Sequence, residues 1–259
     1  MFLSVNAGNT HVVLGAYEGE RLRRVWRISA IAARTEDEYR LLIADLLREE
    51  TPALDSFHGC MISSVIPRLT HVLSIAIRQL LGIEPLVLTH DLDLGIGNTY
   101  HRPEDVGPDR LANAVGGVAR YGAPFIVVDS GTATTFDIVS PDRVYLGGII
   151  MPGLEMSADA LFQKTSRLPR VAIALPLSVI GRSTVDAINS GLIWGATAAV
   201  DRLVVLIRKE LGVFDCPAIA TGGYADLIAR NSTEITRVDP DLTLFGLLKI
   251  WQRNSGKPL

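Results

Sequence analysis

Short polar residues follow an acid in the middle of the chain, in a pattern suited to binding phosphate. Asp129 ends an apolar, β-branched run at 126–128 and is followed by Ser-Gly-Thr-Ala-Thr-Thr. This pattern predicts a buried strand, a tight turn and a second strand. The turn can direct N–H groups and the Thr132 hydroxyl at one point, and Gly131 lets a ligand approach the backbone closely. Because the turn contains no lysine or arginine, hydrogen bonds or a bound cation would have to meet the charge of a phosphate.

The same pattern occurs at the N-terminus, 123 residues earlier. Val5-Asn6-Ala7-Gly8 aligns with Val128-Asp129-Ser130-Gly131, and the short polar residues Asn9 and Thr10 follow. One glycine turn would be weak evidence for a site, but its repetition at half the chain length is stronger. The repeat predicts two lobes, each of which carries a phosphate loop between two strands.

Length and composition agree with two lobes of a globular protein. The 259 residues are enough for two lobes of about 130 residues, which we place at 1–121 and 122–259. A hydrophobic content of 48% with 20% charged residues is typical of a well-packed fold. The net charge of -3 indicates no basic face for nucleic acid. Cys60 and Cys216 match no metal spacing, and we expect both to be buried and free.

The sequence predicts a cytoplasmic protein with no membrane segment. Its longest stretch without Asp, Glu, Lys or Arg is the 14 residues 187–200, shorter than the roughly 20 that span a bilayer. The first residues lack the basic region of a signal peptide.

Helices and strands alternate along the predicted chain, which indicates parallel crossovers in an α/β fold. Thr35 and Glu38 form a capping box before one helix, and Ser183 and Asp186 form another before a long helix toward Leu211. Pro67 is expected to break the chain after a strand at 59–65. Further helices are predicted at 69–81, 108–118, 154–164, 224–229 and 240–251, and further strands at 85–88, 144–151 and 218–221.

Asp109 ends the least regular segment of the chain, residues 91–109. The preceding Gly107-Pro108 suits the first turn of a helix, where an acid favours the helix dipole without any catalytic role. Irregular ordered segments also often carry functional sites. From the residues alone, both interpretations of Asp109 stay open.

Two glycine pairs have both a structural and a functional interpretation, and three further positions have a structural one. Gly147-Gly148 is typical of a strand bulge, or of a place where a ligand approaches the backbone. Gly222-Gly223 suits a base or ribose lying on the backbone, or a plain turn between strand and helix. Thr184 has a structural role in a helix cap. Gly191 and Gly195 each cost about 1 kcal/mol in a helix, so close packing or an interface should compensate.

With these motifs in order, the chain resembles the type III pantothenate kinases, a family of the actin/hexokinase/Hsp70 superfamily. The resemblance covers nearly the whole length. It rests on the two loops, on Tyr100 with the Gly107-Pro108-Asp109-Arg110 segment, on Gly147-Gly148, on Thr184 and on Thr221-Gly222-Gly223. It implies two ribonuclease-H-like lobes with a central cleft, a cytoplasmic homodimer, and the first step of coenzyme A synthesis.

The resemblance also implies a role for each matching residue. Asp109 would accept the proton of the pantothenate hydroxyl that attacks ATP, and Asp129 would hold a monovalent cation, K⁺ or NH₄⁺. Magnesium would arrive with ATP and keep several of its waters. The residues that bind pantothenate would be Tyr100, Gly107, Pro108, Arg110 and Thr184. The phosphates of ATP would be bound by Asn6, Ala7, Gly8, Asn9, Thr10 and Thr132. Gly222 and Gly223 would lie on the adenosine side.

One residue departs from the family pattern. Asn6 stands where the first loop of the family begins with aspartate, and the internal repeat shows the same difference because its partner is Asp129. An amide keeps the shape but lacks the negative charge that would hold Mg²⁺ or its waters. Two alternatives therefore remain: a weak or inactive relative that binds or regulates, and a superfamily kinase for another small alcohol.

Overall fold

The computed structural model describes residues 1–51 and 53–256, which form two compact units. The first unit contains Met1–Arg120 and the chain from Asp241 onward, and the second contains Tyr121–Pro240. The division differs from the predicted one in the place of the last helix, α7 (Leu242–Asn254), which contacts strands of the first unit. The apolar stripe of α7 predicts that the helix is buried on one side, but it does not show which of the two sheets the helix covers.

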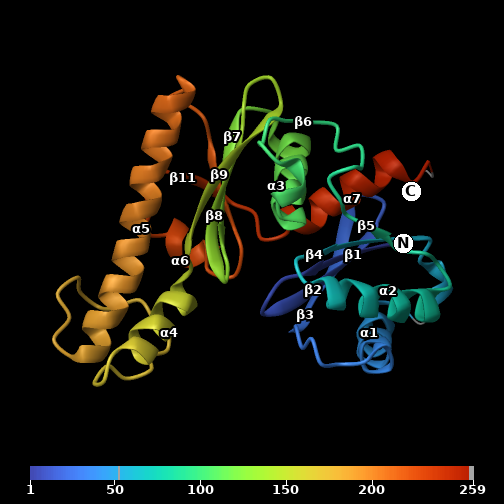
Figure 1. Ribbon diagram of the computed structural model, residues 1–259, viewed down its shortest axis with the longest axis horizontal. Helices are drawn as coiled ribbons and strands as arrows, with labels where there is room; N and C mark the ends of the chain where they lie inside the picture. The colour runs from blue at the N-terminus through green and yellow to red at the C-terminus, as the bar shows by residue number, and fades with distance from the viewer. Residues whose placement is uncertain (52, 257–259) are drawn as a thin grey trace. The chain divides into compact units, whose positions relative to one another are not determined.

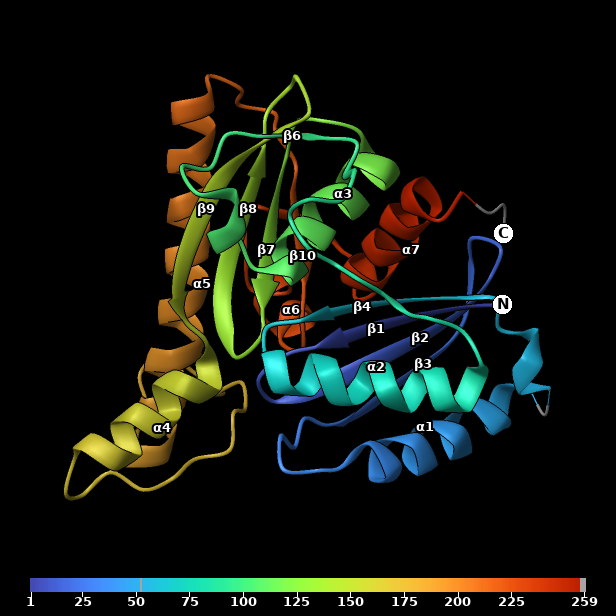
Figure 2. The ribbon, with the colours of Figure 1, turned by 45° about the vertical axis from the view of Figure 1, so that its right-hand side comes forward.

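The first unit is a five-stranded mixed sheet with helices on both faces (Figure 2). Its strand order is β3-β2-β1-β4-β5, with β1 antiparallel to β2 and parallel to β4. Helices α1 and α2 cover one face together, and α7 covers the other. The strands are β1 (Phe2–Ala7), β2 (His11–Glu18), β3 (Arg21–Ser29), β4 (Gly59–Ser64) and β5 (Leu86–Val87), and the helices α1 (Glu36–Glu50), α2 (Pro67–Leu81) and α3 (Pro108–Tyr121). Three short elements complete it: η1 (Leu54–Ser56), β6 (Gly97–Asn98) and η2 (Pro103–Asp105).

Local signals explain the ends of these helices. The predicted capping box of α1 is present, with the Thr35 side chain accepting from Glu38 N and Glu38 reaching back to the cap. Pro67 begins α2 instead of merely ending a strand, because the first helical position needs no N–H donor. Pro108 does the same for α3.

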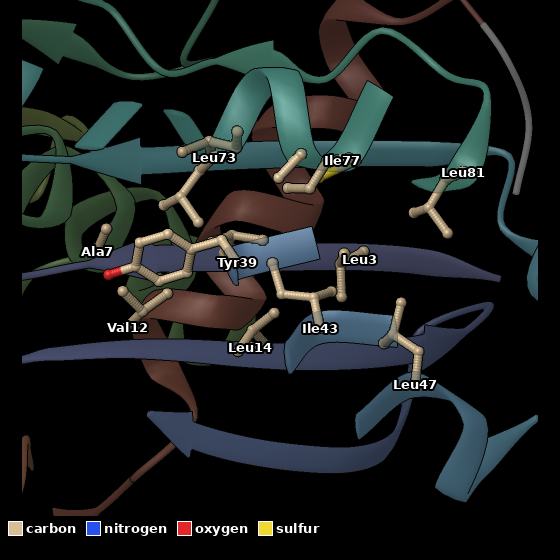
Figure 3. Close-up of a cluster of buried hydrophobic side chains, with 14 of the residues drawn as sticks. Leu3, Ala7, Val12, Leu14, Tyr39, Ile43, Leu47, Leu73, Ile77 and Leu81 are labelled. Carbon is tan, nitrogen blue, oxygen red and sulfur yellow. The ribbon is translucent and has the colours of Figure 1, made fainter. Parts of the chain in front are cut away.

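The core of the first unit lies between its sheet and the pair α1 and α2 (Figure 3). Alternate residues of β1, Leu3, Val5 and Ala7, face this core. The intervening residues Ser4 and Asn6 therefore face α7, since side chains alternate along a strand. In agreement, the Ser4 hydroxyl donates to the carbonyl of Leu244 in α7, at 2.8 Å.

The second unit repeats this plan. Its sheet has six strands, and five neighbouring ones run in the order β9-β8-β7-β10-β11, with β7 antiparallel to β8 and parallel to β10. In both units the first strand lies between the second and the fourth, so the predicted internal repeat is confirmed by topology. The elements are β7 (Phe125–Ser130), β8 (Ala133–Val139), β9 (Val144–Pro152), β10 (Ala218–Thr221), β11 (Ile235–Val238), α4 (Leu154–Lys164), α5 (Thr184–Leu211) and α6 (Ala225–Ala229).

Helix α5 covers one face of the second sheet (Figure 1). By length and composition it is the one helix among the described residues that is apolar enough to cross a membrane. Ile188, Leu192, Val200 and Val204 pack into the core of the unit, which accounts for much of its hydropathy. The helix is therefore part of a protein core, although its opposite face is exposed.

Candidate active site

The first phosphate loop connects β1 to β2 in a tight turn. Gly8 N donates to the carbonyl of His11, at 2.9 Å, and Asn9 and Thr10 are exposed at the tip. A Cβ atom placed on Gly8 would meet only ordinary van der Waals contact, 3.6 Å from that carbonyl. The backbone dihedral of Gly8 is not in the left-handed region either. Packing inside the chain thus gives no reason for a glycine here, whereas close approach of a ligand would.

The second loop, between β7 and β8, has the same character. Gly131 N donates to Ala133 O, at 3.0 Å, and a Cβ on Gly131 would lie 3.6 Å from the Asp129 carboxylate. Thr132 is half-buried at the turn, and its carbonyl accepts from Gly153 N at the start of α4. A side chain on Gly153 would overlap with the carbonyls of Gly131 and Thr132. Gly153 therefore fixes the second loop against α4.

The glycine pair after β10 lies directly beside this loop. Thr221 is paired with Asp129 across the parallel strands β10 and β7. Gly222 has φ +92, and a Cβ there would stand 2.8 Å from Ser130 O and would overlap with Asp129 Oδ1. Gly223 has neither constraint, since nothing lies within 4 Å of a Cβ placed on it. The two glycines thus differ: Gly222 is required by the fold, and Gly223 leaves an open surface.

Tyr224 joins the same group of residues. Its N–H donates to Ser130 O at 3.0 Å, and its hydroxyl donates to the Glu155 carboxylate on α4 at 2.6 Å. Burial, with the hydrogen bond to Glu155, raises the pKa of the Tyr224 phenol to about 12. The phenol therefore stays protonated at neutral pH, and it connects the end of β10 to the helix that follows β9.

Asp109 is half-buried in the first turn of α3, in the first unit. Its Oδ1 accepts from the backbone N–H of Arg110, at 2.9 Å. The same oxygen lies close to Gly107, where a Cβ would stand 2.6 Å away. Burial raises the pKa of the Asp109 carboxyl, and the hydrogen bond and charge of Arg110 oppose this shift only in part. A carboxylate that water solvates poorly is a better proton acceptor than an ordinary surface aspartate.

The rest of the predicted pantothenate segment is ordered around Asp109. Gly107 O accepts from Arg110 N, and the Arg110 side chain is buried. Tyr100 is half-buried, and its N–H donates to Asn98 Oδ1 at 2.9 Å. Pro108 begins α3 as predicted. The segment is therefore irregular but held by its own hydrogen bonds.

Two interpretations of other residues are settled by the structure. Gly147 has φ +119 and lies at a register shift between β8 and β9, so the strand-bulge interpretation is confirmed. At α5 the capping hydroxyl belongs to Ser183, which accepts from Asp186 N at 3.1 Å. The predicted cap of Ser183 and Asp186 is therefore confirmed, and Thr184 is the exposed first residue of the helix that this cap begins.

No three His, Cys, Asp or Glu side chains gather into a metal-binding group within residues 1–51 and 53–256. Asp129, on the second loop, and Asn6, on the first, are single oxygen donors. Neither residue by itself could enclose a metal ion, but either oxygen donor fits a Mg²⁺ ion that arrives on phosphate oxygens and keeps most of its waters. The two buried cysteines are free, as predicted.

Two sheets that share one order of five strands, each with a glycine turn after its first strand, give the duplicated α/β fold of the actin/hexokinase superfamily. Solved structures share the fold. A Campylobacter jejuni protein described as a Baf family transcriptional activator matches with a TM-score of 0.61 and 20% identity, over 98% of this chain and 100% of that one. The activator of 2-hydroxyisocaproyl-CoA dehydratase from Clostridium difficile, solved with bound ADPNP, matches with a TM-score of 0.53 and 12% identity, over 95% and 92%.

Sequence comparison identifies the family within this class. The profile of the type III pantothenate kinases matches residues 2–205. Type III pantothenate kinases of Phenylobacterium zucineum and Geobacter sulfurreducens are 41% and 45% identical to the chain, over 99% and 98% of it and 100% and 99% of their own lengths. The chain belongs to the type III pantothenate kinase family.

Proposed function

We propose that this protein transfers the γ-phosphoryl group of ATP to the hydroxyl of pantothenate, giving 4'-phosphopantothenate for coenzyme A synthesis. The single observation that carries the proposal is the pair of loop glycines, Gly8 and Gly131, at matching positions of two matching sheets. Neither is required by packing within the chain. Phosphoryl transfer needs chiefly positioning and charge stabilisation, which such loops supply.

In this proposal each loop offers its backbone and short side chains to the phosphates of the nucleotide. In the first unit, the loop of Asn6, Ala7, Gly8, Asn9 and Thr10 offers N–H groups and hydroxyls to the phosphates. In the second unit, Thr132 does the same. The open surface over Gly223, next to the tightly packed Gly222, suits the adenosine. The protein would contribute hydrogen bonds to the phosphates where it has no lysine to offer charge.

Asp109 acts as the general base. Its Oδ1 is held by Arg110 N, which leaves Oδ2 to accept the proton of the substrate hydroxyl. Burial, by raising the carboxyl pKa, makes the group more basic toward that proton. Tyr100, Gly107, Pro108 and Arg110 surround Asp109 in sequence and would orient pantothenate. Thr184, exposed at the start of α5, would contribute a further hydroxyl.

Two cations complete the proposed site. Magnesium, brought by ATP, would supply positive charge to the phosphates, with the Asn6 oxygen facing its water shell. A monovalent cation, K⁺ or NH₄⁺, would be held at the Asp129 carboxylate. The roles of this chain's residues are then to hold the phosphates still and to accept one proton.

The exposed face of the second unit supports a homodimer. The segment between α4 and α5 (Figure 1) is apolar and accessible, with Leu175, Leu177, Val179 and Ile180 between 49% and fully exposed. Gly191 and Gly195 on α5 have nothing within 4 Å of a Cβ, so no packing inside the chain repays their cost. A second copy covering this apolar face would do so. We place the enzyme in the cytoplasm, with no nucleic-acid or membrane partner.

A coupled assay of ADP release tests the proposal. Purified protein with ATP, Mg²⁺ and K⁺ should release ADP only when pantothenate is added, and Asp109→Asn should lose turnover while still binding ATP. Pantothenate-independent ADP release, or full turnover in Asp109→Asn, would contradict the mechanism. The same assay with a panel of other small alcohols distinguishes a pantothenate kinase from a kinase that phosphorylates a different alcohol.

Asn6 favours one second candidate, a relative that binds but does not catalyse. Calorimetry with ATP and pantothenate distinguishes the two, because this candidate binds without releasing ADP. The presence of both Asp109 and Asp129 favours the enzyme.

A further inference from the structure

Ser63 is a buried hydroxyl for which the fold provides no use. It lies at the carboxyl end of β4 and is 0% exposed. Its Oγ has no hydrogen-bond partner among the described residues. Buried polar groups are nearly always paired, so a buried unpaired hydroxyl calls for an explanation. Its neighbour Ser64 has one, since the Ser64 hydroxyl is bonded to Ile66 at the start of α2.

The register of the sheet places Ser63 beside Asn6. The parallel pair β1 and β4 aligns Asn6 with Ser63, one strand spacing apart. Cys60 and Ile62 face the core under α1 and α2, so Ser63 faces the opposite side, the side of α7, as does Asn6. The hydroxyl is therefore next to the residue that begins the first phosphate loop.

The second unit has the same pair at the equivalent place. There Asp129 is aligned with Thr221 across β7 and β10. Because the two sheets share one strand order, Thr221 is the counterpart of Ser63, as Asp129 is of Asn6. In both units a hydroxyl residue thus stands opposite the oxygen donor that precedes the loop.

We propose that Ser63 is a positioning residue for Asn6: on nucleotide binding its hydroxyl accepts a hydrogen bond from the Asn6 carboxamide and directs the amide oxygen toward the phosphates and the magnesium waters. An amide needs such a partner because it has one acceptor oxygen and one donor nitrogen, and only one orientation serves a cation. A carboxylate has two equivalent oxygens and needs no selection. The inference rests on the proposed function of the loop in binding ATP.

A double-mutant cycle tests this role. Calorimetry in the presence of Mg²⁺ measures the dissociation constant of ATP for the wild type, Ser63→Ala, Asn6→Asp and the double variant. We expect Ser63→Ala to weaken ATP binding about threefold to tenfold, the value of one hydrogen bond. In the Asn6→Asp background the same change should cost less than about twofold. Pantothenate affinity should not change.

Thermal unfolding without ligand separates positioning from a structural role. Because the hydroxyl is unpaired in the absence of nucleotide, Ser63→Ala should unfold at the wild-type temperature or slightly above it. Ser74→Ala, which removes a helix hydroxyl bonded to Thr70 O, is the matched control and should leave ATP binding unchanged. An equal loss of affinity in both backgrounds, or no loss in either, would overturn the inference. A wild type that does not bind ATP at all would instead overturn the proposed function.

Discussion

The carboxylate of Asp129 lies against the α-carbon of Gly222, so that any side chain at residue 222 would overlap with Oδ1. The next residue, Gly223, has nothing within 4 Å of the place where a Cβ would stand. Two adjacent glycines at the end of one strand therefore serve different purposes. Gly222 lets the loop after β7 and strand β10 come together, and Gly223 leaves the open surface on which we propose that the nucleotide lies.

Substitution of the two glycines should separate these purposes. Gly222→Ala forces a residue with a Cβ into φ +92 and into contact with Asp129, so we expect it to lower the free energy of unfolding by about 2 kcal/mol or more. Gly223→Ala should leave unfolding within about 0.5 kcal/mol of the wild type and weaken ATP binding. Thermal unfolding and calorimetry measure both effects. Equal ATP affinity in Gly223→Ala and wild type would show that the nucleotide does not lie over this residue.

Much of the fold follows from local signals in the sequence. The β-branched runs, the capping box at Thr35 and the proline at 108 placed strands and helix starts within a few residues of those observed. The repeat of Gly8 and Gly131 predicted two matching units, because a duplicated turn implies a duplicated sheet.

Long-range contacts could not be predicted in the same way. Pairing of Asn6 with Ser63, or of Asp129 with Thr221, is a property of sheet register that neither segment shows alone. The position of α7 depends on the contact between Trp251 and Gly59 of β4. A Cβ at residue 59 would overlap with the Trp251 indole, so only a strand with a glycine at this point can accept the helix. The predicted central cleft involves both units and stays a prediction.

The pH dependence of turnover should reveal the raised pKa of Asp109. The base must be ionised, so kcat/KM should fall as pH decreases through its pKa. Burial raises that pKa, so the fall should begin above the ordinary aspartate value of about 3.9. Asp105→Asn, which removes an exposed acid four residues away, is the control and should leave the profile unchanged. A profile that stays flat down to the ordinary carboxyl range would argue against a buried base.

The raised pKa of Asp109 also affects stability. Turnover should fall as pH decreases, whereas the free energy of unfolding should fall as pH rises. A carboxyl whose pKa is raised by folding stabilises the protein when protonated and loses that contribution as pH rises through the folded value. Asp109→Asn should therefore unfold at or above the wild-type temperature at pH 7, with the difference vanishing toward acid pH. A large loss of stability at pH 7 would show that the carboxylate is well compensated by Arg110.

Asn6→Asp should strengthen the interaction with magnesium and raise turnover. A carboxylate accepts charge-assisted hydrogen bonds, roughly twice as strong as those of an amide, so we expect ATP affinity at fixed Mg²⁺ to improve by up to about tenfold. The Mg²⁺ concentration at half-maximal rate should fall in parallel. Gln79→Glu adds the same charge at an exposed site on α2 and is the matched control. No change, or a decrease, in Asn6→Asp would mean that the first loop binds phosphate without a cation nearby.

Gly191 and Gly195 on α5 provide a test of the homodimer that does not depend on activity. Alanine at either position gains about 1 kcal/mol of helix propensity, and the chain itself offers no obstacle, since nothing lies within 4 Å of the new Cβ. In an isolated subunit both variants should therefore be more stable than the wild type. In the proposed dimer the glycines let another copy approach, so Gly195→Ala should instead weaken association by about tenfold or more, because added methyl groups force packed surfaces apart.

Two measurements separate these effects of Gly195→Ala. Sedimentation across a concentration series measures association, and thermal unfolding at the lowest concentration measures the stability of the subunit. Glu210→Ala, at the exposed end of α5, is the control for helix propensity, and it should leave association unchanged because it lies in the last turn, far along the helix from both glycines. A Gly195→Ala protein that gains stability at every concentration, with its association unchanged, would show that this helix face stays exposed to water and that any homodimer uses another surface.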